Sequence, residues 1–128
     1  MVSIIKVRDW MTSPVMSVHP EENVQDIAVL MDKNDIGAVV VMTESQQLCG
    51  ILTQRDLIAK VLSKGKDAKA TSAKDIMSKE VITVTPEASL LEVSKMMNKY
   101  HIGNVVVLEN NKVVGIITAR DLIELVSS

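Results

Sequence analysis

The stretch Gly50-Ile51-Leu52-Thr53-Gln54-Arg55-Asp56-Leu57-Ile58 occurs a second time, slightly changed, as Gly115-Ile116-Ile117-Thr118-Ala119-Arg120-Asp121-Leu122-Ile123. In both copies an apolar run leads into Thr-x-x-Asp, which is a variant of the capping box that opens a helix. The stretch therefore predicts a strand that passes directly into a helix, and it predicts this junction twice.

The repetition extends upstream of this motif. A shift of 66 places lays Asp9 to Met42 over Asp75 to Leu108, with the valines Val39–Val41 over Val105–Val107. The shift becomes 65 in the polar turn after Val41, which is one residue shorter in the second copy. Because true repeats keep their strands in register and vary in their loops, we interpret the chain as a duplication.

Each copy predicts the element order βαββα. A short apolar segment ends at a proline, and a helix follows whose start is marked in the second copy by the capping box Ser89 to Glu92. Two β-branched runs joined by a polar turn predict a hairpin, and the repeated motif begins the last helix. The fold class is therefore α/β (α+β). We place the first repeat at residues 7–62, a polar linker at 63–73 and the second repeat at 74–126.

Composition narrows the classes of function. The 128 residues carry a net charge of −2 and only 2% aromatic residues, so we expect no nucleic-acid binding. The apolar runs are too short for a membrane helix, which predicts no membrane insertion. One cysteine, Cys49, and no signal peptide favour the cytoplasm. No catalytic triad, carboxylate pair or metal-spaced cluster occurs, so we expect neither an enzyme nor a metal site.

The repeated motif has chemistry suited to a nucleotide. A helix N-terminus attracts phosphate, a threonine hydroxyl and an arginine can add donors, and an aspartate can accept hydrogen bonds from ribose hydroxyls. The alternative is that Thr-x-x-Asp only caps its own helix, because duplication alone would preserve it. The residues by themselves leave both interpretations open.

The paired repeats, together with the openings Asp9-Trp10-Met11-Thr12 and Asp75-Ile76-Met77-Ser78, strongly resemble the CBS-domain family. The tandem pair resembles the unit called a Bateman module, over residues 7 to 126. The resemblance implies a disc-like module with pseudo-twofold symmetry and two clefts between the repeats. It also implies adenosyl ligands (AMP, ADP, ATP or S-adenosylmethionine), with no covalently bound cofactor.

Ligand-binding residues can be carried over from the resemblance by position. One cleft would combine Thr53, Arg55 and Asp56 with Lys79, Val81, Ile102 and Gly103; the other would combine Thr118, Arg120 and Asp121 with Ser13, Val15, Ile36 and Gly37. The family often has a proline after this wall, where Val39 and Val105 stand in this chain. The fold expectation is unaffected, but the adenine contacts are less defined.

The two predicted clefts differ in charge. The wall expected opposite Thr53 carries Lys79 and His101, whereas the wall opposite Thr118 carries Ser13 and Asp35 at the matching places. Opposite charge near a polyphosphate is favourable. We therefore predict that the first cleft prefers the more highly phosphorylated ligand.

Two functions from different classes remain. The first is a regulatory, ligand-sensing module, expected to form a homodimer and to modulate an effector protein that the sequence does not identify. The alternative is a scaffolding pair that dimerises without a ligand, with both motifs acting only as helix caps. A ligand panel separates them, because a ligand bound only by the native state raises its melting temperature.

Overall fold

The computed structural model describes residues 3–128, which form two compact units. One unit is Met16–Val81, and the other combines the residues up to Val15 with Ile82–Ser128. The body of each repeat therefore forms a compact unit with the opening segment of the other repeat. The segment Asp75 to Ser78 belongs to the unit of the first repeat, and Asp9 to Thr12 belongs to that of the second.

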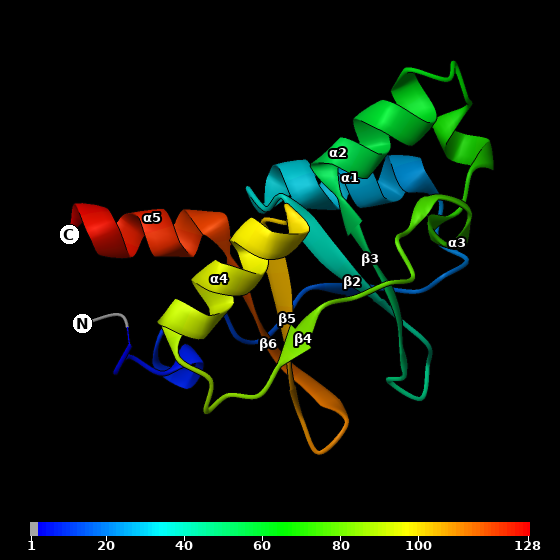
Figure 1. The fold of residues 1–128 in the computed structure, drawn as a ribbon. Coiled ribbons are helices and arrows are strands. Elements are labelled where there is room, and N and C mark those ends of the chain that lie inside the picture. The colour runs from blue at the N-terminus through cyan, green and yellow to red at the C-terminus, as the bar shows by residue number, and fades with distance from the viewer. Residues whose placement is uncertain (1–2) are drawn as a thin grey trace. The chain divides into compact units, whose positions relative to one another are not determined.

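The unit Met16–Val81 has the predicted order βαββα (Figure 1). Its elements are β1 (Ser17–Val18), α1 (Val24–Lys33), β2 (Ala38–Met42), β3 (Leu48–Thr53) and α2 (Gln54–Leu57), followed by the π-helical turn η2 (Ile58–Leu62), η3 (Ala68–Ala70) and α3 (Ala73–Ile76). The sheet order is β1-β2-β3; β1 is parallel to β2, and β3 is antiparallel to it.

The second unit repeats this topology. Its elements are η1 (Val7–Asp9), β4 (Thr83–Val84), α4 (Leu90–Tyr100), β5 (Asn104–Glu109), β6 (Lys112–Thr118) and α5 (Ala119–Ser127). The sheet order is β4-β5-β6, with the same parallel and antiparallel pairings. The mixed α/β fold class and the duplication are therefore confirmed. The first strand of each repeat is short, with two residues each in β1 and β4.

The helix starts lie where the capping residues predict them. Asn23 accepts a hydrogen bond from the backbone N–H of Asp26 at the start of α1, and Ser89 accepts one from Glu92 at the start of α4. Helix α4 ends at His101, which adopts the left-handed conformation with φ 54° and is exposed. His101 is thus an exposed residue at the end of this helix.

Each unit has its own aliphatic core. In the first unit, α1 contributes Val24, Ile27 and Met31, which pack with residues of the strands, η2 and α3: Val18, Val39, Val41, Leu52, Val61, Ala73 and Ile76. In the second unit the buried set is Val7, Ala88, Leu90, Val93, Met97, Val105, Val107 and Ile117. Burial of this aliphatic surface is the main favourable term for a chain with so few aromatic residues.

The opening segments are joined to the sheets by short antiparallel bridges. Ile51 on β3 pairs with Ser78, and Ile116 on β6 pairs with Thr12. The N–H of Ile51 donates to the Ser78 carbonyl at 3.0 Å, and the N–H of Ser78 donates back at 2.9 Å. A Cβ added to Gly50 would lie 2.6 Å from the same Ser78 carbonyl oxygen. The repeated motif begins with glycine because the backbone of the opening segment crosses there and occupies the space that a side chain would need.

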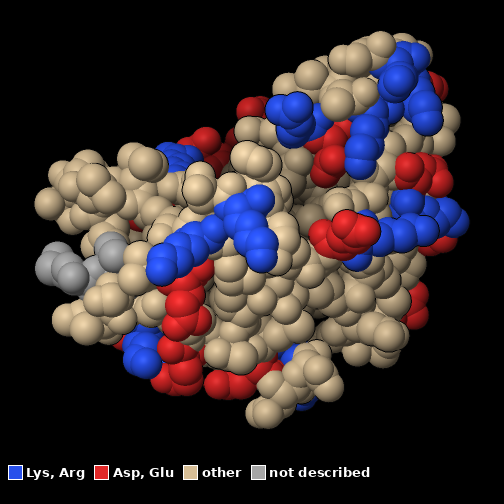
Figure 2. All heavy atoms as spheres, in the orientation of Figure 1, with Lys and Arg blue, Asp and Glu red and all other residues tan. Residues whose placement is uncertain are grey.

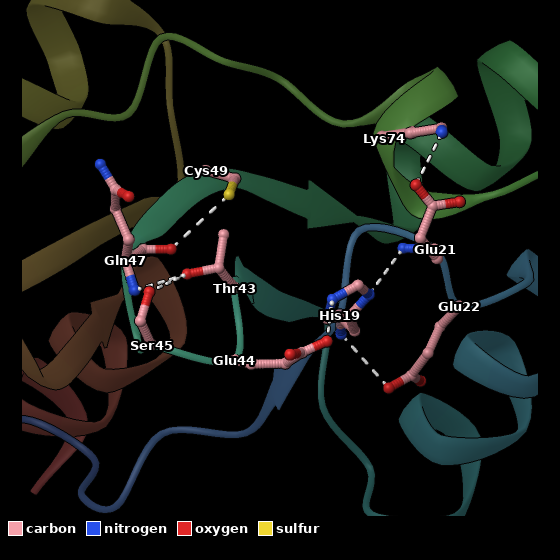
Figure 3. A network of polar contacts seen from close by, with 9 residues as sticks. All are labelled: His19, Glu21, Glu22, Thr43, Glu44, Ser45, Gln47, Cys49 and Lys74. Atoms are coloured by element: carbon pink, nitrogen blue, oxygen red, sulfur yellow. Dashed lines mark hydrogen bonds and ion pairs between the residues drawn. The ribbon is translucent and has the colours of Figure 1, made fainter.

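The first hairpin turn and the start of α1 are fixed by local polar contacts (Figure 3). Thr43 accepts a hydrogen bond from the backbone N–H of Gln47, and His19 accepts one from the backbone N–H of Glu21. Lys74 pairs with Glu21 at 2.7 Å, and this hydrogen bond and charge raise the pKa of Lys74 above its ordinary value.

The last helix of each repeat leaves several apolar side chains in contact with solvent. Ile58, Leu62, Ile123 and Val126 are all exposed. In the first repeat the buried position is Val61, at 2% exposure, whereas its equivalent Val126 is 78% exposed. Leu125 packs on the core of the second unit instead, and Lys60 occupies its place in the first. A lysine side chain resists burial, so Lys60 does not fill the core position that Leu125 has in the second repeat. The wider turn of the π-helix brings Val61 into the core instead.

Candidate functional site

The first helix opening comprises Thr53, which ends β3, and Asp56 in α2. The backbone N–H of Thr53 donates to Oδ2 of Asp56 at 2.9 Å, and the Thr53 hydroxyl donates to the same oxygen at 3.1 Å. In return, the Asp56 N–H donates to the Thr53 hydroxyl at 3.3 Å. This is a complete capping box, and it holds the Asp56 carboxylate in one orientation.

The second helix opening comprises Thr118 and Asp121 and has the same geometry. The N–H and hydroxyl of Thr118 donate to Oδ2 of Asp121 at 2.8 and 3.0 Å. The Asp121 N–H donates to the Thr118 hydroxyl at 3.2 Å. Both motifs therefore do cap their helices, as the scaffolding alternative requires, but in each case only Oδ2 of the carboxylate is used for the cap.

The remaining carboxylate oxygens distinguish the two openings. Oδ1 of Asp56 lies 3.0 Å from Nζ of Lys60, which also donates to the Ile76 carbonyl at 2.8 Å. Across the part of the chain that the structure describes, no hydrogen bond or ion pair reaches Oδ1 of Asp121. Leu125 stands where the second repeat would need a lysine to match. In the first opening, Oδ1 of the carboxylate is thus paired with a cation. In the second opening, the equivalent oxygen has no partner among the described residues and can accept hydrogen bonds.

Trp10, which lies in the opening segment Asp9 to Thr12, contacts the helix opening formed by Thr118 and Asp121. Nε1 of Trp10 donates to the backbone carbonyl of Asp121 at 2.7 Å. Its side chain packs against the core of that unit. Ile76 takes the equivalent place in the unit Met16–Val81, where its carbonyl accepts from Lys60. In each unit, an opening segment is therefore bonded to the last helix.

The other predicted residues are distributed over the two units. The unit Met16–Val81 holds Thr53, Arg55, Asp56, Lys79, Val81, Ile36 and Gly37; the other holds Thr118, Arg120, Asp121, Ser13, Val15, Ile102 and Gly103. Within a unit, the Gly37 carbonyl accepts from the N–H of Gln54, and the Gly103 carbonyl accepts from that of Ala119. Each glycine lies against the helix opening of its own repeat. The pairing of each opening with a wall of the other repeat stays a prediction.

Sequence reasoning missed Lys60 and the Trp10 hydrogen bond. Lys60 follows Asp56 by four residues, which is a spacing that pairs opposite charges on a helix, so the signal was present. The Trp10 contact joins residues 111 positions apart, and no local pattern predicts it.

Other kinds of site find little support in residues 3–128. No group of three or more His, Cys, Asp or Glu side chains there is arranged to hold a metal ion. No helix in that range is long and apolar enough to cross a membrane. Positive and negative side chains are interspersed on the face drawn in Figure 2.

Two α/β units, each with a capped strand–helix junction and an opening segment from the other repeat, define a tandem-repeat module. The CBS domain family model matches residues 7–63 and 73–128. The chain belongs to the CBS-domain family and contains two copies of that domain.

Solved structures and a curated relative agree with this assignment. A conserved protein from Pyrococcus horikoshii is 29% identical, with a TM-score of 0.93 over 100% of this chain and 96% of that one. The CBS-domain pair of protein MJ0100, in complex with 5′-methylthioadenosine and S-adenosyl-L-methionine, is 30% identical, with a TM-score of 0.88 over 97% of each chain. Protein MK0525 of Methanopyrus kandleri is 37% identical over 86% of this chain, and the match spans 57% of that relative.

Proposed function

We propose that this chain is a regulatory module that binds adenosyl ligands at the helix openings Thr53–Asp56 and Thr118–Asp121. The observation that carries the proposal is the carboxylate of Asp121. Its Oδ2 is held by two donors, and its Oδ1 keeps both lone pairs for a ligand. Vicinal ribose hydroxyls supply two donors. The adenosyl compounds bound to the related MJ0100 pair support this ligand class.

The proposed role is sensing rather than catalysis. A bound nucleotide favours the conformation that binds it more tightly, and a partner protein with a preference for that conformation then responds. In the proposed site, Thr118 orients the carboxylate and Asp121 accepts the ribose hydroxyls. The ligands considered are AMP, ADP, ATP and S-adenosylmethionine.

Thermal unfolding with a ligand panel tests the proposal. We expect AMP, ADP, ATP or S-adenosylmethionine to raise the melting temperature, with NAD as an additional comparison. A ligand at 100 times its Kd stabilises the native state by about 2.7 kcal/mol, which corresponds to a shift on the order of 10 °C. Unchanged melting temperatures with every compound would favour the scaffolding function instead.

The same proposal includes a homodimer. Ile58 and Ile123 occupy equivalent positions in the two repeats and are 56% and 66% exposed, so the last helices present apolar side chains to solvent. A second copy of the chain offers the same apolar residues, as a symmetric interface requires. Burial of these side chains would stabilise the dimer.

Ile123→Glu tests this assembly by sedimentation velocity. We expect it to shift the chain from dimer toward monomer while the melting temperature of the monomer changes little, because Ile123 is exposed. Val29→Glu on α1, where Val29 is also exposed at 59%, is the matched control and should leave the dimer intact. A dimer that tolerates Ile123→Glu would contradict the proposed interface.

A further inference from the structure

We infer that Lys60 makes the first helix opening selective for phosphorylated adenosyl ligands over uncharged ones, whereas the second opening lacks this selectivity. The inference rests on the proposed function, which it refines by assigning a ligand preference to one residue. It begins from the difference between the two carboxylates: Lys60 contacts Oδ1 of Asp56, and Leu125 stands at the matching place beside Asp121.

The lone pairs on each carboxylate limit what a ribose can gain. Oδ2 of Asp56 accepts from both the N–H and the hydroxyl of Thr53, so its two lone pairs are used. Oδ1 accepts from Lys60, which leaves one lone pair for the two hydroxyls of a ribose. At Asp121 the corresponding oxygen has both. Both ribose hydroxyls can therefore donate hydrogen bonds to Asp56 only if Lys60 breaks its contact with Oδ1.

The cost of this exchange depends on the ligand's charge. The side chain of Asp56 is 15% exposed and that of Lys60 is 44% exposed, so water replaces the lost contact of the carboxylate poorly and that of the ammonium only in part. Adenosine brings no anion to replace the carboxylate. AMP carries a phosphate, which gives the ammonium a new charge-assisted hydrogen bond.

Lys60 is held where it could make that exchange. Its ammonium donates to the Ile76 carbonyl at 2.8 Å, and Ile76 ends α3 within the same unit. A lysine has three donors, so it can keep the Ile76 contact while a second proton turns from Asp56 toward a phosphate. The carbonyl thus fixes the cation beside the carboxylate before and after the exchange.

Titration calorimetry with adenosine and AMP measures the preference directly, because these ligands differ only by the phosphate. Asp121→Asn is introduced first to weaken ligand binding at the second opening, so that the measured Kd describes binding at the first opening. On that background, we expect AMP to bind at least about tenfold more tightly than adenosine, as one charge-assisted hydrogen bond provides. Lys60→Met should reduce the ratio of the two Kd values roughly tenfold, partly by tightening adenosine binding, and Lys60→Arg should restore it.

The mirror experiment adds the lysine to the second repeat. On an Asp56→Asn background, Leu125→Lys should raise the AMP preference above that of the parent, and this arm does not depend on the folding of a Lys60 variant. If both ligands bind but neither Lys60→Met nor Leu125→Lys changes the Kd ratio, the assignment to Lys60 is overturned and the proposed function stands. If neither ligand binds the unmodified chain or any variant, this inference is overturned, and the melting temperatures with ADP, ATP and S-adenosylmethionine then decide the proposed function separately.

Discussion

Gly50→Ala is expected to destabilise the protein by about 3 kcal/mol and to lower its melting temperature by roughly 10 °C. A Cβ at this position would lie 2.6 Å from the backbone carbonyl oxygen of Ser78 and 2.8 Å from Sδ of Met77. The carbonyl cannot turn away cheaply, because it accepts from the N–H of Ile51 in the bridge that holds the opening segment. Gly50→Val adds two more methyl groups in the same space and should lower the stability further.

The equivalent glycine of the second repeat should be more tolerant. A Cβ on Gly115 would overlap Sδ of Met11, which can change rotamer, and would lie 3.2 Å from the nearest backbone atom, the Thr12 carbonyl oxygen. Gly103→Ala is the matched control, since its Cβ would meet only Ala119 at 3.8 Å. Chemical denaturation of the three alanine variants ranks them. A Gly50→Ala protein as stable as the control would show that Ser78 does not cross there.

The elements that sequence reasoning predicted well are those fixed by neighbours in the chain. The helix starts at Asn23, Thr53, Ser89 and Thr118 depend on side chains that cap their own backbone within three residues. The strands Ala38–Met42 and Asn104–Glu109 follow from valine runs that are buried along their length. Such signals lie within a short window, so one sequence is enough to detect them.

The features that were missed depend on contacts between distant residues. Nothing near Met77 and Ser78 indicates that this segment pairs with β3 of the preceding repeat, because a single bridge has no periodicity. The exposure of Ile58 and Ile123 also could not be predicted, since an apolar residue on a helix can face a core or a second protein. The two helix openings were predicted from their residues, but the closure of one by Lys60 depends on where Ile76 lies.

Asp121→Asn is expected to weaken binding of AMP at the second helix opening by roughly 10- to 150-fold, which corresponds to about 1.5–3 kcal/mol for hydrogen bonds that involve a charged group. The asparagine keeps one carbonyl oxygen for the N–H of Thr118, so the cap is retained. It replaces the other carboxylate oxygen with an amide that donates, and a ribose hydroxyl can no longer donate to that atom. The loss should therefore be seen in ligand affinity and not in the melting temperature of the free protein.

Thr118→Ala measures how much the cap itself contributes to stability. It removes the hydroxyl that accepts from the Asp121 N–H and donates to the Asp121 carboxylate, so it should cost about 1 kcal/mol of stability while leaving both carboxylate oxygens in place. Asp56→Asn completes the comparison in the first repeat. Because Asp56 shares its carboxylate with Lys60 and Asp121 does not, ATP and AMP affinities should respond unequally to the two asparagine substitutions. Equal losses for both ligands in both variants would mean that the two openings are equivalent, and the predicted difference in phosphate preference would then be wrong.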